Sequence, residues 1–491
     1  MNYRLIIIFC FSAITGFGQT GNLRDQQHDF DIFYDGLHRI ESRLDRHTSI
    51  DSVEHFLTEA KTAFYTTELS PIEQFNWYAR CINLVASGHT QAQPSRKVLK
   101  AYVLAKKSLP FDLVMVNKHL YTNGYPSQKS KQPKRDKSTE LAKGTEIIAI
   151  DGKSIDGWMK EIGLLIGSDE DDPDFEYLVA GQAFDLYRFL VTKEHKESLE
   201  VTTVHGKDTQ SRTITLSYPP IELIQQRFKA AEQQAEKDRR KPGTFKLIGS
   251  DVAYFRFTTF LDAIGKDYSE FLKKSFKKID KKKTVETVVI DVRGNGGGNV
   301  QTELISYFLD KPQSVGSYTI DKRLGPGERK HIVKNNRFFR LYKKGVRRSK
   351  RYEKRHPEYN GELMSYPVDT SLLFKGNIIV LTDEATFSAA SLLASQLKTL
   401  CNAKVMGSRA GGSFYVCNAG TLTYKLPHSG ISFIFNPNTC KSTLNADSID
   451  PNMKNVDVEI VPEYDPKPSV YKKNWEEVVK KAVRAAKKQS N

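Results

Sequence analysis

The sequence predicts an α/β (α+β) protein, because apolar runs typical of buried strands are each followed by a segment with helical spacing. The first such unit joins the strand Thr287–Val292 to a helix that starts at Thr302. The second joins the strand Ile378–Leu381 to a helix that ends near Leu400, with its apolar side chains on one face. The chain has 491 residues, enough for about three domains.

The N-terminus has the pattern of a secretory signal peptide. Arg4 precedes the apolar run Leu5–Phe11, and small residues follow as far as Gly18. We expect cleavage near Gly18 or Gln19, with residues 1–18 as the signal peptide. This predicts an exported protein in the periplasm, the cell envelope or the extracellular space. A lipid anchor on Cys10 is not expected, because a bulky residue precedes this cysteine. No later stretch reaches the ~18 apolar residues of a membrane span, so no transmembrane helix is expected after signal removal.

Residues 27–97 are predicted to form an N-terminal helical region. Apolar residues recur at helical spacing through its first half. Ser70–Glu73 has the composition of a helix start, with serine as the cap, proline in the first turn and glutamate three residues later. This helix should end near Gly88, directly before His89. A histidine at a helix end is usually structural, but it is also suited to project into a cleft and act as a general base.

Residues 98–220 are predicted to form a β-rich domain. The expected strands are Ala101–Leu104, Phe111–Val116, Leu199–Val204 and Thr213–Ser217. Leu141–Ile155 resembles the second half of a PDZ domain, with Thr145 in place of the usual Asp and Asp151 in place of the usual Asn. PDZ domains bind an extended peptide as an added strand. The alternative for this segment is an ordinary hairpin.

Residues 221–246 are predicted to form a charged, helical connector. It leads into a core domain at residues 247–466, and a basic helix at residues 467–491 ends the chain. Within the core domain, Val252–Phe257 alternates in the way of a strand, and Asp267–Ile279 is amphipathic in the way of a helix.

The buried strand that ends at Val292 is followed by a glycine turn, Arg293–Asn299, with the sequence RGNGGGN. The turn lacks the Lys-Ser/Thr of a phosphate-binding loop and the spacing of a dinucleotide fingerprint, so we reject nucleotide binding. Glycines let backbone N–H groups approach a ligand closely. Gly296 or Gly297 could therefore donate a hydrogen bond to a developing oxyanion.

Ser388 lies where the turn after the second strand becomes a helix. The N–H groups at a helix start have no acceptor within the helix, and the helix dipole favours negative charge there. A serine at this point can present its hydroxyl to a substrate while the N–H of Ala389 faces an oxyanion. The alternative is a plain helix cap, the commoner role of a serine at such a position.

The cysteines give no support for a metal site. Of the 5 cysteines, one lies in the expected signal peptide, and none of the others forms a CxxC pair, so neither a metal nor another cofactor is expected. Thr421–Leu426 and Ile431–Phe435 are predicted to pair about the turn between them. Continued in register, this pairing puts Cys417 opposite Cys440, where the two could form a disulfide.

The formal net charge of +16 is concentrated in one segment. Asp321–His356 contains fifteen Lys or Arg residues against three acids, a contribution of 15 − 3 = +12. Since export is expected, nucleic acid is not the expected partner, and an anionic cell-envelope polymer, lipid head groups or an acidic protein are favoured. The alternative is a solvated loop without a dedicated partner.

Taken together, these residues resemble serine peptidase family S41, which includes the C-terminal processing peptidases and the catalytic core of tricorn protease. Val289–Gly298 matches the family's hIIDhRGNGGG motif, and Gly88-His89-Thr90 matches its GHT. Ser388–Ser391 stands at its S-A-x-E nucleophile turn, and Gly407–Gly412 at its G-x-x-x-G-G. The resemblance extends from about residue 30 to about residue 465.

The resemblance implies a crotonase-like αβ peptidase core with an inserted PDZ-like domain and with Ser388 as the nucleophile. In the processing peptidases a lysine activates the serine, but its position aligns with Ser413 in this chain. The tricorn-like branch uses a histidine before the PDZ region, where this chain has His89. That branch also uses an acid near the end of the core, and here Asp447 and Asp450 are both candidates.

The activity implied by the resemblance is peptide hydrolysis without a cofactor. His89 would accept the proton of Ser388, whose oxygen would attack a peptide carbonyl while the amides of Ala389 and Gly297 hold the oxyanion. Peptides or unfolded proteins are the expected substrates. Ser391 replaces the family's glutamate, and the alternative function is a catalytically silent protein that binds peptides or hydrophobic ligands on the same fold.

Overall fold

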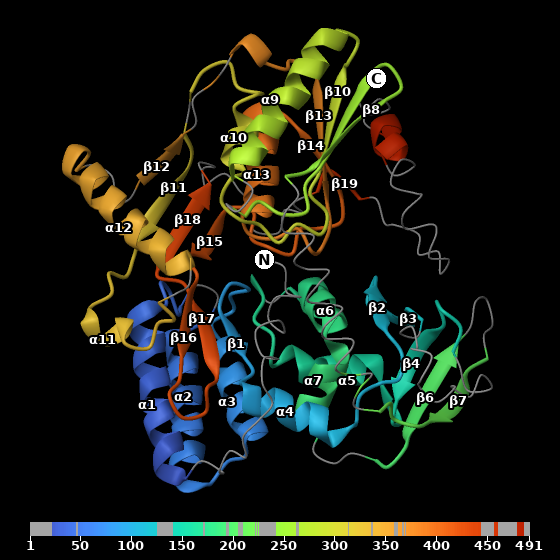
Figure 1. Cartoon of the computed structure of the whole chain (residues 1–491), viewed down its shortest axis with the longest axis vertical. Coiled ribbons are helices and arrows are strands. Elements are labelled where there is room, and N and C mark those ends of the chain that lie inside the picture. Colours follow the sequence, from blue (N-terminus) through green and yellow to red (C-terminus); the bar gives the residue numbers. More distant parts are fainter. Residues whose placement is uncertain are drawn as a thin grey trace.

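The computed structural model describes most of the chain (Figure 1). The described residues are 22–45, 48–124, 141–169, 172–192, 196–204, 210–220, 222, 224, 242–261, 265–312, 314–334, 337–357, 362–365, 368, 370–442, 456–459 and 479–485. The expected signal peptide, most of the expected connector and both candidate acids, Asp447 and Asp450, lie outside these residues.

The expected N-terminal helices are present. They are α1 (Leu23–Ile40), α2 (Ile50–Thr66) and α3 (Pro71–Asn83). The helix start predicted at Ser70 is confirmed, because the Ser70 side chain accepts from the backbone N–H of Glu73 and the Glu73 carboxylate accepts from the backbone N–H of Ser70.

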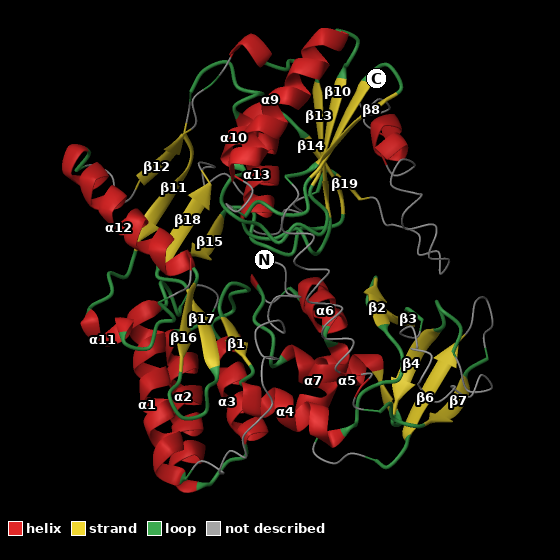
Figure 2. Cartoon of the chain, in the orientation of Figure 1, coloured by secondary structure: helices red, strands yellow, loops and turns green. Residues whose placement is uncertain are grey.

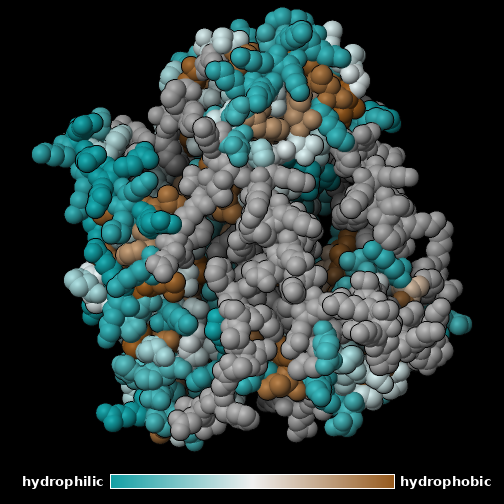
Figure 3. Space-filling model, in the orientation of Figure 1, coloured by the Kyte–Doolittle hydropathy of each residue, from teal (hydrophilic) through white to brown (hydrophobic). Residues whose placement is uncertain are grey.

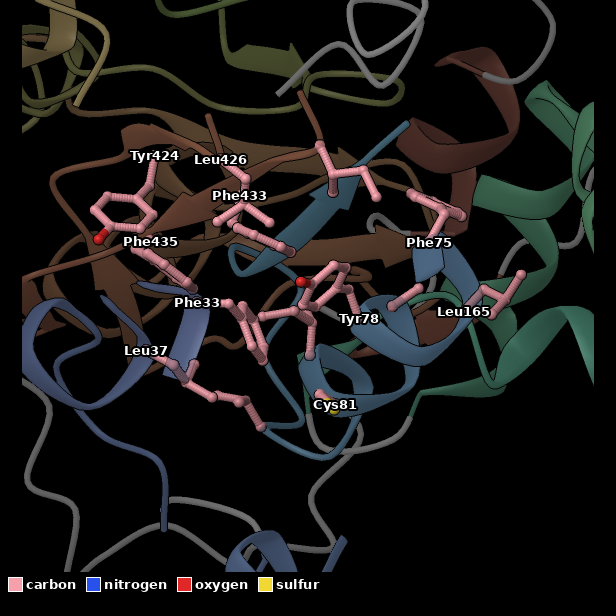
Figure 4. Packing of buried hydrophobic residues seen from close by; sticks show 14 of the residues in the cluster. Phe33, Leu37, Phe75, Tyr78, Cys81, Leu165, Tyr424, Leu426, Phe433 and Phe435 are labelled. Atoms are coloured by element: carbon pink, nitrogen blue, oxygen red, sulfur yellow. The ribbon is translucent and has the colours of Figure 1, made fainter. Parts of the chain in front are cut away.

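An aromatic cluster joins these helices to a hairpin near the other end of the chain (Figure 4). The ring of Phe33 on α1 lies 4.7 Å from that of Phe433, which belongs to β17 (Ser432–Phe435). Tyr78 on α3 contacts both rings and is itself fully buried. Because large buried aromatic rings dominate core energetics, this cluster fixes the N-terminal helices on the hairpin.

One predicted strand is wrong. Ala101–Leu104 belongs to the helix α4 (Arg96–Ala105), which starts at Ser95, whose hydroxyl accepts from the N–H of Val98. Its buried side chains recur at helical spacing, at Val98, Leu99, Tyr102 and Val103. A four-residue apolar run fits either element, and here the cap and the longer pattern decide for the helix.

The predicted β-rich domain contains a six-stranded antiparallel sheet with the order β2-β3-β4-β6-β7, in which β5 pairs with β4. Its strands are β2 (Leu113–Val116), β3 (His119–Thr122), β4 (Glu146–Ile150), β5 (Lys153–Ser154), β6 (Leu199–Val204) and β7 (Arg212–Leu216). The strand predicted at Leu199–Val204 is confirmed with its exact bounds. The PDZ-like assignment of this domain stays a prediction.

The sequence analysis did not predict three helices between β5 and β6. They are α5 (Ile155–Gly163), α6 (Pro173–Gln182) and α7 (Phe184–Val191). α6 starts at Asp172, whose carboxylate accepts from the N–H groups of Asp174 and Phe175. These helices place Asp169 and Phe175 near the candidate site described below.

The core domain is built on a second six-stranded sheet with the order β19-β14-β13-β10-β9-β8. Its strands are β8 (Thr244–Ile248), β9 (Val252–Arg256), β10 (Thr287–Asp291), β13 (Asn377–Thr382), β14 (Lys404–Gly407) and β19 (Val458–Glu459). Neighbouring strands run parallel except β8 and β9. β10 is buried throughout, as predicted, whereas β9 is buried along most of its length instead of alternating.

Helices cover both faces of this sheet. One face packs on α9 (Gly265–Lys282), α10 (Thr302–Ile305) and α13 (Ala389–Cys401), as Figure 1 shows. The other face contacts the helical residues 479–485 through Val479 and Ala482. The amphipathic pattern predicted at Asp267–Ile279 is confirmed as α9. A 3₁₀ turn at Thr370–Leu372 lies against α9.

Two smaller sheets lie between the six-stranded sheet of the core domain and the N-terminal helices (Figure 2). The first has the order β1-β17-β16, with β1 (Gln91–Gln93) and β16 (Leu422–Lys425). The second has the order β12-β11-β18-β15 and contains β11 (Ser314–Ile320), β12 (Glu362–Ser365), β15 (Val416–Ala419) and β18 (Asn438–Ser442). Leu422 pairs with Phe435 and Lys425 with Ser432, which confirms the predicted hairpin.

The basic segment is not a solvated loop. It contains the short helix α11 (Pro326–Arg329) and the long helix α12 (Arg337–Arg355), which packs against β11 and β12. The loop alternative is wrong because apolar residues at helical spacing, among them Phe339 and Tyr342, are buried on one side of α12.

The arrangement of several sheets with helices on their faces confirms the predicted α/β (α+β) fold class. Among the residues that the structure describes, no helix is both long enough and apolar enough to cross a bilayer.

The pairing of Cys417 with Cys440 generates a testable prediction. The two residues face each other across β15 and β18, as the hairpin register predicted, although the ladder passes into the second small sheet there. Neither residue forms a disulfide in the structure, and both are buried. A thiol oxidant should link them, because directly opposed cross-strand side chains need little movement to reach bonding distance. The link should raise the free energy of unfolding by roughly 3 kcal/mol.

Peptide mapping of the oxidised, unreduced protein measures this link, and denaturant unfolding measures its stabilising effect. Cys401 is the internal control, since it lies at the end of α13 and should stay unlinked. If Cys417 and Cys440 are both alkylated after oxidation and denaturation without reductant, the prediction fails.

Candidate active site

Ser388 occupies a sharp turn between β13 and α13. Its backbone angles are φ 56° and ψ −126°, a conformation that L-residues rarely adopt. It stands at the N-cap position of α13, yet its side chain makes no capping hydrogen bond. The residue is half-buried. The hydroxyl is therefore not used as a helix cap, the alternative that the sequence left open.

Hydrogen bonds around Thr386 hold this turn. The Thr386 hydroxyl lies 3.1 Å from both the Val292 carbonyl oxygen and an Asp383 carboxylate oxygen, and accepts from the Asp383 N–H at 3.0 Å. Its carbonyl accepts from the Ser391 hydroxyl at 2.9 Å. Ser391, which replaces the family's glutamate, is thus a buried support of the turn. Backbone strain persists only where the surroundings over-determine it, and this network supplies that restraint.

The glycine turn lies directly against Ser388. A Cβ atom at Gly297, where φ is 93°, would meet the Ser388 Cβ at 2.7 Å and the Ala389 nitrogen at 3.0 Å. A Cβ atom at Gly412 would meet the Ser388 nitrogen at 2.8 Å. Only glycine fits either approach. The structure therefore brings Ser388, Ala389 and the glycine turn together, with the Gly407–Gly412 loop beside them.

The three candidate oxyanion donors differ in whether their backbone N–H groups already donate a hydrogen bond. Ala389 is the first residue of α13, so its N–H has no acceptor within the helix. The N–H of Gly297 donates to the Asn295 side-chain oxygen at 2.9 Å. Among the described residues, Gly296 makes no such donation to a backbone or side-chain acceptor. Of the three amides, Gly297 is therefore the one that would have to release an acceptor, Asn295, before it could bind an oxyanion.

The structure also brings His89 to this turn. Its imidazole ring is buried and packs on the Phe387 ring, with centroids 4.5 Å apart. Phe387 directly precedes Ser388, so the His89 ring contacts the residue next to the candidate nucleophile. The Asn436 side chain donates to the His89 carbonyl at 3.0 Å and holds the backbone at this point.

Asp169 fastens the His89 segment to the loop beside Ser388. This buried carboxylate accepts from the Gly88 N–H at 2.8 Å and from the Ser413 N–H at 3.0 Å. Sequence analysis missed it, since no motif surrounds Asp169 and its two partners are distant in the sequence. Phe175 also stacks on the Phe387 ring, with ring centroids 4.9 Å apart.

Asp291 anchors the start of the glycine turn. Its buried carboxylate accepts from the Arg293, Arg256 and Tyr254 side chains. Burial acts to raise the pKa of Asp291, but the two arginines and Tyr254 outweigh it and hold this pKa below its ordinary value. Since the pKa is lowered, the ionised carboxylate stabilises the fold above the ordinary pKa of about 3.9, and the stabilisation is lost as the pH falls below it.

Asp447 and Asp450 are outside the described residues. Lys404 lies in β14 and Lys425 in β16. Ser413 stands at the aligned position of the processing-peptidase lysine and accepts from the Val416 N–H at 3.3 Å. Among the described residues, no cluster of His, Cys, Asp and Glu side chains could hold a metal ion.

Solved structures of related shape include that of mature CPAF, with a TM-score of 0.56 and 14% sequence identity. That comparison covers 86% of this chain and 90% of the CPAF chain. Mature CPAF complexed with lactacystin gives a TM-score of 0.55 over 86% of this chain and 91% of the other. At this identity the likeness shows that the fold is shared.

Sequence comparison points the same way. A stretch of 169 residues is 26% identical to the carboxy-terminal processing protease CtpB of Bacillus subtilis (strain 168). The match covers 34% of this chain and only 26% of the relative's own length. Residues 251–431 match the model of Peptidase family S41. The chain therefore contains a Peptidase family S41 domain.

Proposed function

We propose that this protein is an exported serine peptidase in which Ser388 is the nucleophile and His89 the general base. The observation that carries the proposal is the strained turn at Ser388, whose hydroxyl does not cap α13 and which lies against the glycine turn. The S41 domain supports peptides or proteins as the substrate class. The expected export rests on the sequence of residues 1–18.

The proposed reaction is acyl transfer to Ser388. His89 accepts the hydroxyl proton as the Ser388 oxygen attacks the peptide carbonyl, and the N–H groups of Ala389 and Gly296 stabilise the oxyanion. Collapse of this intermediate breaks the C–N bond, and the proton held by His89 passes to the leaving amine. Water, deprotonated by His89, then hydrolyses the acyl-enzyme. Asp447 or Asp450 would orient His89 through its second ring nitrogen.

The first prediction tests the nucleophile. Ser388→Ala should abolish labelling by a fluorophosphonate probe, since the probe reacts only with an activated serine hydroxyl. Ser391→Ala is the matched control: it removes a serine of the same turn whose hydroxyl bonds the Thr386 carbonyl. It should keep labelling and lose about 1 kcal/mol of stability. Gel fluorescence and thermal unfolding provide the two measurements.

Ser388→Gly tests whether the backbone at position 388 is strained. Glycine adopts a positive φ without cost, so this variant should lose labelling and gain about 1 kcal/mol or more of stability. Labelling of Ser388→Ala at the wild-type level would exclude Ser388 as the nucleophile. A correctly folded wild-type protein that is never labelled would favour the alternative of a catalytically silent binding protein.

The second prediction tests the base. His89→Ala should lower hydrolysis of a small ester by about 10²- to 10⁴-fold, the usual contribution of a general base. Lys404→Ala and Lys425→Ala remove the lysines nearest in sequence to the processing-peptidase position, and each should keep most of the activity. With a histidine as the base, wild-type activity should rise with pH in a single step that lies well below about pH 9.

Initial rates across a pH series distinguish the two kinds of base. A rise centred near about pH 9 would indicate a lysine, whose ordinary pKa is about 10.4. Full activity of His89→Ala would equally rule out the proposed base.

The third prediction concerns Asp169 as a positioning residue. In Asp169→Asn the amide nitrogen can only donate, so one of the Gly88 and Ser413 N–H groups loses its acceptor. Stability should fall by about 1 to 3 kcal/mol, and kcat should fall with little change in KM, because the His89 segment is no longer fixed.

Asp174→Asn is the control for Asp169. It removes a nearby carboxylate whose exposed ion pair with Lys118 should contribute at most about 1 kcal/mol, and kcat should be unaffected. If Asp169→Asn destabilises the fold but leaves kcat intact, Asp169 supports the fold and does not position His89.

A further inference from the structure

The helix α12 has two faces of opposite character. Its inner face packs on the protein: Phe339, Tyr342 and Ser349 are buried there. The Tyr342 hydroxyl donates to the Lys322 carbonyl at 3.0 Å and accepts from the Leu324 N–H at 3.1 Å. These contacts fix the rotation of the helix about its own axis. The orientation of its outer face is therefore defined by the fold.

The single acid of α12 is also on the inner face. Glu353 binds the Arg323 side chain at 2.6 Å and accepts from the Ser349 hydroxyl one turn earlier. The negative charge of Glu353 is thereby paired with Arg323 and does not reduce the positive charge of the outer face. The helix of 19 residues carries no other Asp or Glu.

The outer face is entirely cationic. Figure 3 shows hydrophilic residues gathered over this helix. With 3.6 residues per turn, the exposed Lys and Arg residues fall within one half of the helix circumference. They are Arg340, Lys343, Lys344, Arg347, Arg348, Lys350, Arg351, Lys354 and Arg355. The stripe runs most of the length of the helix, about 28 Å.

These cations are spaced so that like charges face one another. Residues four apart are neighbours on a helix surface, and like-charge pairs at this spacing destabilise the helix. Such pairs are Arg340 with Lys344, Lys343 with Arg347, Arg347 with Arg351, Lys350 with Lys354, and Arg351 with Arg355. A helix that only needed to be soluble could interleave acids, as α9 does with its Lys274–Glu270 pair. The arrangement in α12 is suited to a bound polyanion that lies along the stripe.

The same face is poorly suited to a bilayer. A helix that lies on a membrane buries an apolar face among the lipids and keeps its cations at the rim. In α12 the aromatic side chains of Phe339 and Tyr342 are buried where the helix packs on the protein's own sheet. Among the α12 side chains that the structure describes, which are those of residues 339–355, none is an exposed large hydrophobic residue. These side chains can therefore attract a partner through charge alone, and the charges form a row along the helix instead of covering a broad surface.

We propose that the outer face of α12 is a docking surface for a linear anionic polysaccharide, one that carries sulfate, carboxylate or phosphate groups along its length. The surface is independent of the Ser388 chemistry proposed above. It would hold the protein on such a polymer through charge-assisted hydrogen bonds from a continuous row of Lys and Arg side chains. No apolar contact is required.

The test uses the full-length mature protein on immobilised heparin, a linear sulfated polysaccharide. The affinity should fall on the order of a thousandfold between about 50 and 200 mM salt, as for polyanions that contact about six cations or more. Lys343→Glu, Arg347→Glu, Arg351→Glu and Lys354→Glu combined should abolish binding at about 150 mM salt. The same four positions changed to Gln should lower the slope of log affinity against log salt by about one for each cation removed.

The matched control reverses four exposed lysines of α9, namely Lys273, Lys277, Lys281 and Lys282, to Glu. This changes the net charge by the same amount on another helix. The α9 variant should keep at least a tenth of the wild-type affinity. Vesicles of phosphatidylglycerol and phosphatidylcholine, duplex DNA and uncharged dextran are the comparison ligands. Thermal unfolding and ester hydrolysis confirm that each variant is folded.

Loss of heparin binding in the α12 variants, with binding kept in the α9 variant, supports the proposal. Equal losses in both variants would show an effect of net charge alone and overturn it. Binding to vesicles or to duplex DNA that is tighter than binding to heparin would overturn the assignment to a polysaccharide. Salt-independent binding, or none at low salt, would overturn the docking surface altogether.

Discussion

The parallel pairing of β10 with β13 decides where the candidate site lies. Thr287 is opposite Asn377 and Asp291 is opposite Leu381, so the two strands end level at the same edge of the sheet. Turns that follow adjacent parallel strands meet at their carboxyl ends. Here one turn carries the glycines and the other carries Ser388. Gly297 lies so close to Ser388 that a Cβ atom on Gly297 would clash with it. A shift of one residue in the strand register would move the two turns relative to each other and break this contact.

The other parts of the chain are organised around the residue before Ser388. The Phe387 ring contacts both His89, which follows the N-terminal helices, and Phe175, which belongs to α6. Asp169 adds two hydrogen bonds between the same regions. The N-terminal helices and the region of residues 98–220 are thus not simply appended to the core. Each supplies a side chain to the surroundings of the strained turn.

Sequence reasoning succeeded where a local pattern was enough. The capping box at Ser70, the buried strand at Thr287 and the hairpin register that opposes Cys417 and Cys440 all follow from short-range rules. The position of Ser388 at a helix start also follows from the change of period between strand and helix.

The same reasoning failed where tertiary contacts or longer patterns decide. Ala101–Leu104 is too short a run to distinguish a strand from part of α4, and the helices α5 to α7 follow apolar patterns that were left unassigned. Asp169 carries no local signal, because its partners at Gly88 and Ser413 become neighbours only in the folded chain. The engagement of the Gly297 amide by Asn295 likewise depends on the exact shape of the turn.

The energetics of Ser388 argue for a role outside the fold itself. A residue held at such backbone angles costs on the order of 1 to 3 kcal/mol, and a serine that does not cap its helix forgoes about 1 kcal/mol more. Glycine would avoid the strain, and Asp or Asn would tolerate the positive φ better while retaining the chance to cap. None of these residues offers an aliphatic hydroxyl at the edge of the sheet. The surrounding network of Thr386, Asp383 and Asn295 holds the turn that carries this hydroxyl, which is the arrangement expected under the proposed role of Ser388.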